Sequence, residues 1–150
     1  MLEGTIMGDE TVIRELVARR VEAMRAGDVE ALVGDYLPEA VAFTLAPPLR
    51  HTAPEVQDPE ALRGWFASFD SAVDFEVRDL VVEVGGGVAF CFSLNRVSAV
   101  PRGGSGAFDL WFRSTLGLRE VGGVWRIAHE HTSTPFYMDG SFSSAVDLKP

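Results

Sequence analysis

Apolar residues in the first part of the chain recur with the spacing of helices. From residue 9 to about residue 26 they fall within one half of a helical wheel, and most charged residues fall on the other half. Gly27 is a stop signal for this helix, and Asp28 can cap a second, shorter helix that ends near Tyr36. A short strand at residues 41–45 and a proline-rich loop follow. Asp58-Pro59-Glu60 then opens a third helix, which we expect to run to about Phe69.

The rest of the chain changes to the apolar and alternating runs that are typical of strands. Four runs, at residues 73–84, 88–100, 107–121 and 124–133, are separated by segments rich in glycine or containing proline. Such short connections favour an antiparallel meander. Helices followed by a long-stranded antiparallel sheet are typical of an α+β domain. A curved sheet wrapped on three helices leaves a cone-shaped cavity, where we expect the functional site.

Composition places the chain among ordinary globular proteins. Its 150 residues are 47% apolar and 23% charged, which excludes disorder and allows one domain with a buried core. We expect residues 1–8 to be an N-terminal extension and residues 9–134 to be the domain. We expect residues 135–150 to be a tail packed on that domain by Phe136, Tyr137 and Phe142.

The net charge and the cysteine count narrow the partners and the compartment. A formal charge of −9 argues against nucleic acid, which requires a clustered basic surface, and against anionic membranes. No apolar run approaches the length of a membrane span, and no secretory signal is visible. Cys91 is the single cysteine and cannot form an internal disulfide. Together these features predict an acidic protein of the cytoplasm.

The last strand carries the most prominent candidate chemistry. Trp125 and Ile127 favour burial, and strict alternation places His129 and His131 on the same face. Two imidazoles there could ligate a metal, act as general acid and base, or bond to a ligand. They could equally be core histidines bonded to neighbouring side chains. A metal would need a third ligand from elsewhere, such as His51, so we expect no metal and no cofactor.

Polar and aromatic residues on other elements are further candidates to face a ligand. Arg20 falls within the apolar half of the first helix, where it needs a partner or a polar cavity unless it reaches solvent. Arg113 could pair with Asp109 or hold a carboxylate or carbonyl oxygen of a ligand. Asn95, the only amide of its strand, is either a ligand-orienting group or a strand-edge residue. Trp65 is part of an apolar stripe that is either core or cavity wall.

Several motifs form a recognisable layout along residues 9–150. They are Arg25-Ala26-Gly27-Asp28, Trp65-Phe66, Asp109-Leu110-Trp111-Phe112-Arg113, Trp125-Arg126-Ile127 and His129-Glu130-His131. Together they resemble the nuclear transport factor 2-like superfamily, and within it the SnoaL-like, ketosteroid isomerase-related group of small bacterial proteins. The resemblance implies a cystatin-like fold, in which a curved antiparallel sheet wraps three N-terminal helices. It also implies a small-molecule ligand and frequent homodimerisation, with a function that varies among members.

The resemblance carries expectations for single positions. The aspartate base of ketosteroid isomerase would fall near Leu45, its tyrosine at Arg20 and its acid near Thr115, and none of the three matches. Arg20 and Thr115 would nevertheless face the pocket, as their counterparts do. By parity along the strand, Trp111 and Arg113 would then face it as well.

These residues together predict a donor-rich, positively charged pocket. Such a pocket would suit an acidic or carbonyl-bearing small molecule. His129 or His131 would serve as general acid or base in an enzyme of isomerase, cyclase or hydrolase type. The alternatives are ligand binding without turnover and a homodimerisation module.

Overall fold

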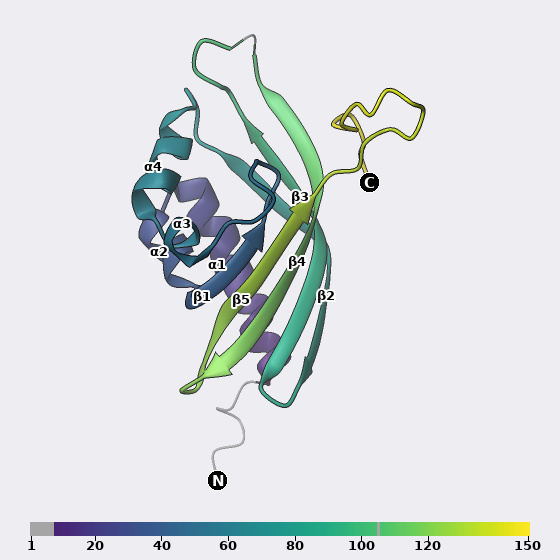
Figure 1. Cartoon of the computed structure of the whole chain (residues 1–150). Coiled ribbons are helices and arrows are strands. Elements are labelled where there is room, and N and C mark those ends of the chain that lie inside the picture. The colour runs from purple at the N-terminus through teal and green to yellow at the C-terminus, as the bar shows by residue number, and fades with distance from the viewer. Residues whose placement is uncertain (1–7, 105) are drawn as a thin grey trace.

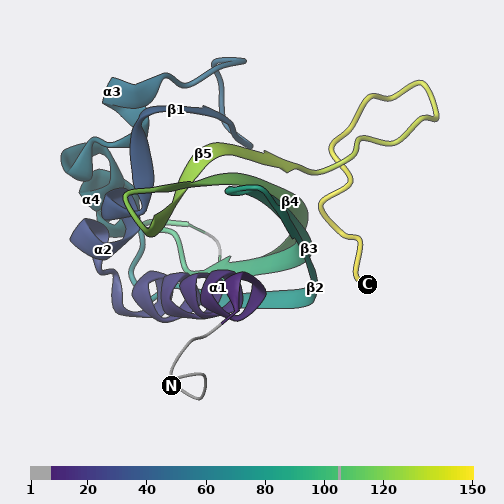
Figure 2. The same ribbon diagram turned by 90° about the horizontal axis from the view of Figure 1, so that it is seen from below.

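A curved five-stranded sheet and the helices on its concave side make up the fold (Figure 1). The computed structural model describes residues 8–104 and 106–150. The expected N-terminal extension therefore lies, up to residue 7, outside the described residues. In Figure 2 the sheet curls around a space that α1, α2 and α4 border. The α+β class predicted from the sequence is confirmed.

The helices begin and end at residues whose chemistry explains their limits. They are α1 (Asp9–Ala26), α2 (Val29–Gly34), α3 (Ala53–Val56) and α4 (Pro59–Ala67). Two acids stand in the first turn of α1, where the helix dipole favours them, and Gly27 ends the helix in the left-handed conformation at φ 66°. Asp28 caps α2 by accepting from the Ala31 N–H, and Asp58 caps α4 by accepting from Glu60. Gly8, rather than the acid after it, is the N-cap of α1.

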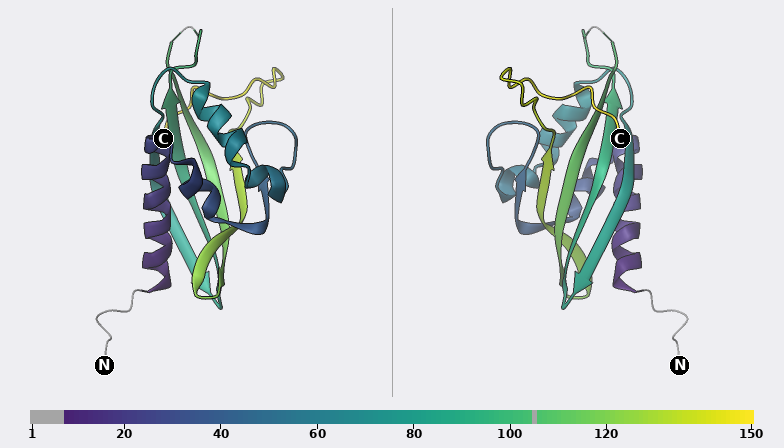
Figure 3. Two further views of the ribbon diagram at one scale, coloured as in Figure 1. Left: turned by 90° about the vertical axis from the view of Figure 1, so that its left-hand side faces the viewer. Right: turned by 90° about the vertical axis from the view of Figure 1, so that its right-hand side faces the viewer.

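The strands are the expected four and a longer first one. They are β1 (Tyr36–Phe43), β2 (Asp74–Gly85), β3 (Val88–Ala99), β4 (Phe108–Val121) and β5 (Val124–Ser133), in the order β1-β5-β4-β3-β2. The antiparallel meander from β2 to β5 is as predicted, with paired glycines at positive φ in two of its turns. β1 differs, because it begins at Tyr36, where we expected a helix to end, and pairs with β5 in parallel. Figure 3 shows α1 alongside β2.

A β-bulge in β5 determines which of its side chains face the helices. Gly117 of β4 pairs with His129, while the next residue, Leu118, pairs with Ile127. Ala128 is therefore an extra residue without a partner of its own. Such a residue shifts the alternation of side chains on all that follows it.

The bulge overturns the face that strict alternation assigns to the two histidines. Ile127, before the bulge, is fully buried on the concave side. Beyond the bulge, Glu130 and Thr132 line the concave side. His129 and His131 consequently lie on the convex side.

The faces of β4 are also the reverse of those inferred from the resemblance. Phe112 and Leu116 are buried on the concave side together with Ser114. Thr115 and Arg113 are exposed on the convex side. The two large apolar residues gain more from burial than the charged and hydroxyl side chains between them, which explains this orientation.

The main core fills the narrow part of the fold, between α1 and the sheet. Ile13, Leu118 and Ile127 are among its most buried side chains, each at most 2% exposed. A second cluster around Phe69 and Phe112 lies at the wider part. The space between these clusters is where the cavity lies.

Of the three aromatic residues of the C-terminal tail that we expected to pack on the domain, Tyr137 is half-buried and donates to Asp147 within the tail, and the other two are exposed. Phe136 and Phe142 contact each other but remain 53% and 70% exposed. The end of the tail instead returns to the convex face, where Lys149 forms an ion pair of 3.3 Å with Asp109. In Figure 1 the tail extends away from the sheet before it returns.

Replacement of Ile127 by alanine should lower the free energy of unfolding by about 3 kcal/mol, because the side chain is fully buried and its loss leaves a cavity. Urea unfolding followed by circular dichroism measures the change. Val124→Ala is the matched control on the same strand, since Val124 is 49% exposed. Equal losses in the two variants would contradict the position of Ile127 in the core.

Candidate functional site

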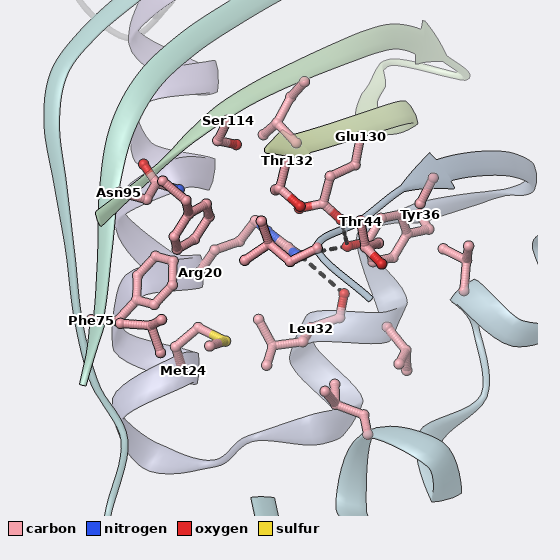
Figure 4. A pocket seen from close by; sticks show the side chains of 18 of the residues that line it. Arg20, Met24, Leu32, Tyr36, Thr44, Phe75, Asn95, Ser114, Glu130 and Thr132 are labelled. Carbon is pink, nitrogen blue, oxygen red and sulfur yellow. Dashed lines mark hydrogen bonds between the residues drawn. The ribbon is translucent and has the colours of Figure 1, made fainter. Parts of the chain in front are cut away.

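A cavity of about 470 Å³ lies between the concave face of the sheet and the helices (Figure 4). Its lining is chiefly apolar and comes from all four helices, β1, the loop after β1 and all four meander strands. Its larger apolar side chains include Met24, Leu32, Leu62, Trp65, Phe75 and Phe112. A cavity of this size and character suits a small organic molecule.

Arg20 enters the cavity wall from α1 with its charge already paired. Its guanidinium donates to a carboxylate oxygen of Asp35 and to the carbonyl oxygen of Leu32, both at 3.0 Å. Desolvation by burial opposes its charge, but pairing with Tyr36, Glu130 and Asp35 outweighs this effect and raises the pKa of Arg20 above its usual value. Arg20 is therefore a fixed cation that organises its neighbours.

Tyr36 links this cation to a carboxylate. Its hydroxyl donates to Glu130 Oε1 at 2.6 Å and accepts from Arg20 at 3.1 Å. Burial, followed by the negative charge of Glu130, raises the pKa of Tyr36 above its ordinary value, and Arg20 only partly offsets this. The phenol stays protonated and can orient the carboxylate.

The charge of this cluster differs from the positive pocket that we expected. Arg20 contributes one positive charge, and Asp35 and Glu130 contribute one negative charge each, so the sum is −1. Arg113 and the two histidines of β5, which were to supply further positive charge, lie on the convex side. The cavity therefore favours a neutral ligand over an anionic one.

A second polar group stands at the β1 end of the cavity. The ring of His51 contacts Glu55 Oε2 through Nδ1, and Thr44 Oγ1 and the Ala46 carbonyl oxygen through Nε2, each at 3.1 Å. His51, Glu55 and Thr44 all line the cavity. From the sequence we considered His51 only as a possible metal ligand. Its i, i+4 spacing to Glu55 is the one signal that could have identified the pair.

The floor of the cavity carries a row of hydroxyl groups. Ser93 pairs with Ser114 across β3 and β4, and Ser114 pairs with Thr132 across β4 and β5. All three line the cavity, as does Asn95. The Ser93 hydroxyl donates to Asn95 Oδ1 at 2.7 Å. Alternation within β3 and β4 alone could not have revealed this row, because its third member follows the bulge.

Of the predicted ligand-binding residues, Arg20, Trp65 and Asn95 line the cavity. Trp65 lies on α4 and is 37% exposed. Asn95, at 7% exposed, is buried on the floor.

The remaining predicted residues lie on the convex face. The guanidinium of Arg78 lies 5.1 Å from the ring centre of Trp111, and Arg113 donates to Ser133 at 3.2 Å. Trp111 and Arg113 line a smaller cavity of about 290 Å³ beside the end of the tail. Thr115 pairs with His131 across β4 and β5.

The two histidines of β5 have partners on the convex face. His129 Nδ1 lies 2.7 Å from the Val41 carbonyl oxygen. The rings of His129 and His131 both lie edge-on to Phe43, at 4.8 and 5.5 Å between ring centres. Neither ring lines the main cavity, so general acid or base chemistry by these histidines in that cavity is not supported.

The cysteine, possible metal ligands and helix hydropathy provide no further candidate site in the described part of the chain. Cys91 lines the cavity, and burial raises the pKa of its thiol to about 11, so it is a poor nucleophile near neutral pH. Among residues 8–104 and 106–150, no three His, Cys, Asp or Glu side chains converge as a metal site requires. In the same part of the chain, no helix combines the length and hydropathy needed to cross a membrane.

The family follows from a comparison with known proteins. Residues 13–137 match the family model of the SnoaL-like domain. The chain therefore belongs to the SnoaL-like family, within the nuclear transport factor 2-like superfamily. No curated protein sequence matches it significantly.

Solved structures show the same fold. A nuclear transport factor 2-like protein of unknown function from Pseudomonas putida is 29% identical, with a TM-score of 0.80 over 94% of this chain and 96% of that one. A Novosphingobium aromaticivorans protein, named provisionally as a scytalone dehydratase, is 12% identical, with a TM-score of 0.74 over 85% of each chain. A provisionally named dehydratase from Streptomyces avermitilis is 18% identical, with a TM-score of 0.71 over 83% of this chain and 95% of that one. The last two similarities show the fold alone.

Tyr36 should resist ionisation in the folded protein. The chain has two tyrosines, so Tyr137→Phe leaves Tyr36 as the only source of phenolate absorbance. Its raised pKa means that the folded state holds the proton more tightly than the unfolded chain. This stabilisation is present below the unfolded pKa of about 10 and is lost as pH rises through the folded pKa.

Ultraviolet titration, with circular dichroism to follow folding, measures this effect. In Tyr137→Phe, phenolate absorbance should appear only at or beyond unfolding. In the control Tyr36→Phe, the half-buried Tyr137, whose pKa is raised chiefly by its hydrogen bond to Asp147, should still ionise at lower pH than Tyr36. A phenolate midpoint at the ordinary tyrosine value in folded Tyr137→Phe would contradict the buried hydrogen bond to Glu130.

Proposed function

We propose that this protein binds a neutral, largely apolar compound with a carbonyl or hydroxyl group and transfers a proton on it, with Glu130 as the base. The hydrogen bond of 2.6 Å between Tyr36 and Glu130, in the wall of an apolar cavity, is the observation on which we base this. It leaves Glu130 Oε2 without a hydrogen-bond partner among the described residues. That oxygen is free to take a proton from a bound molecule.

The surroundings of Glu130 suit a base. Tyr36 donates to one oxygen and fixes the direction of the other, while Arg20 remains charged behind it. Apolar walls strengthen such interactions because little water competes. A positioned carboxylate can accelerate proton transfer by roughly 100-fold to 10,000-fold.

In a dehydration, Glu130 would take the proton of a carbon, and the imidazole of His51, paired with Glu55, would donate a proton to the hydroxyl on the neighbouring carbon, which leaves as water as the double bond forms. The carboxylate at 3.1 Å orients the imidazole, and both side chains line the same cavity. A base and an acid on different walls are what removal of water from a hydroxy compound requires. Provisional dehydratase names among structures of the same fold are compatible with this class of reaction.

Glu130→Gln should reduce catalysed proton exchange at the carbon next to the carbonyl of β-tetralone, a neutral two-ring ketone. The amide can still accept from Tyr36 but is a far weaker base, so we expect a loss of about 100-fold or more. Deuterium incorporation from heavy water, followed by mass spectrometry, measures the rate.

His131→Gln is the matched control, because His131 is one residue away and faces the convex side. It should retain the wild-type rate. An unchanged rate in Glu130→Gln would remove Glu130 as the base. Binding of the ketone without any acceleration by the wild-type protein would favour the alternative of a ligand-binding module without turnover.

We further propose that two copies of the chain associate through their convex faces. On this face, one row of paired residues crosses all five strands: Val81, Phe92, Thr115, His131 and Phe43. The row contains three apolar side chains, one hydroxyl, one imidazole and no carboxylate. Phe92 is 46% exposed, and its neighbour Phe90 is 43% exposed. A twofold axis through such a row places apolar surface against apolar surface, which favours a second copy as the partner.

Phe92→Glu should convert a dimer into a monomer, because it places a charge within this row, on a side chain that is 46% exposed. Light scattering coupled to size-exclusion chromatography gives the mass. Phe142→Glu, a phenylalanine of the tail that is 70% exposed, is the control and should remain dimeric. A wild-type protein that is monomeric at all concentrations would remove the proposed association.

A further inference from the structure

The floor of the cavity contains a buried amide that the folded protein does not satisfy. Asn95 is 7% exposed and lines the cavity from β3. Its Oδ1 accepts from Ser93 at 2.7 Å, but its Nδ2 has no hydrogen-bond partner in the described part of the chain. No fully enclosed side-chain polar atom there lacks a partner, so this amide nitrogen keeps some accessible surface, and Asn95 lines the cavity. A buried donor without a partner costs free energy unless water or a ligand meets it.

Ser93 fixes the orientation of this amide. Because the Ser93 hydroxyl donates to Oδ1, the two amide protons point away from Ser93. The walls beside the amide are apolar: Phe112 pairs with Asn95 across β3 and β4, and Phe75 lies on the same side of the cavity (Figure 4). Ser114, 6% exposed on the adjacent strand, also has a hydroxyl without a partner among the described residues. The floor thus offers one oriented amide donor and one hydroxyl that can turn toward a ligand.

Asn95 lies at the end of this floor that is farther from Glu130. The register places Asn95 and Glu130 two strands and four residues apart, on the order of 15 Å between α-carbons. Figure 4 shows Ser114 and Thr132 between them. A single carbonyl cannot contact both ends, so one ligand that meets both must carry two separate polar groups.

We propose that Asn95 is a specificity-determining residue that recognises a second acceptor oxygen of the ligand. This oxygen lies at the end of the ligand far from the group whose proton Glu130 takes. The ligand class is then a neutral compound at least two fused rings long, with oxygen at both ends and an apolar middle. This assignment rests on the proposed function of the cavity. It adds the requirement that the ligand carry a second oxygen, which proton transfer to Glu130 alone does not impose.

Two probes that differ in one group test the assignment. They are β-tetralone and the same ketone with a methoxy group at the far end of its aromatic ring, which adds an acceptor and no donor. The methoxy compound should bind wild-type protein about tenfold more tightly, as expected for one hydrogen bond to a buried donor. In Asn95→Leu, the ratio of the two dissociation constants should fall to about one. Thr115→Val, on the convex face, should leave the ratio unchanged.

The side-chain amide spectrum supplies a second measurement that needs no variant. The chain has one asparagine and one glutamine, so a ¹⁵N-labelled sample shows two side-chain amide pairs. The Asn95 pair should shift on addition of the methoxy compound. The Gln57 pair, which donates to the Tyr36 carbonyl oxygen at 2.9 Å, should not.

The outcomes separate this assignment from the proposed function. An equal ratio in wild type and Asn95→Leu, or an unmoved Asn95 pair in the bound state, would overturn the role of Asn95 alone. Tighter binding of the analogue with a hydroxyl instead of the methoxy group, with the amide protons unmoved, would mean that Asn95 presents its oxygen, and would also overturn it. If neither ketone binds the wild-type protein, the proposed function fails and this assignment fails with it.

Discussion

The buried guanidinium of Arg20 is the constraint around which the cavity is organised. A cation inside an apolar wall must be neutralised where it stands, and three segments supply what it needs: the carbonyl end of α2, the carboxylate of Asp35, and the hydroxyl that begins β1. Through Tyr36 the same network reaches Glu130 on β5. One charge thus holds the first helix, the second helix and two adjacent strands in a fixed relation around the cavity.

That arrangement also determines the electrostatic character of the site. Because the negative groups of the cluster outnumber its one cation, the cavity does not attract anions even though an arginine is present. Its polar groups are instead separated by apolar surface: a carboxylate with its phenol at one end, a histidine and glutamate near β1, and hydroxyl and amide groups on the floor. A ligand is selected by where its few polar atoms lie, and its bulk contributes binding through apolar contact.

The sequence predicts the fold well, and the site only in part. Helix caps and stops at Gly27, Asp28 and Asp58, and the paired glycines of the hairpins, are local signals, and the structure confirms them. Arg20 could be singled out from the sequence because a charge within an apolar stripe needs a partner or a polar cavity, and in the structure it lines the cavity. Tyr36 was missed because the pattern extended the second helix over it. His51 lines the cavity because of the path of the loop after β1, and tertiary packing rather than local periodicity determines that path.

The extra residue at Ala128 has a consequence for how members of this family are compared. Because Ala128 has no partner on β4, each side chain that follows it on β5 lies on the face opposite to the one that strict alternation assigns. An alignment that places residues 124–133 against a relative without the bulge, and introduces no gap, equates cavity residues with surface residues. Function transferred through such an alignment would be assigned to His129 or His131 and would pass over Glu130. Superposed structures, rather than matched letters, are the sound basis for transferring function across this strand.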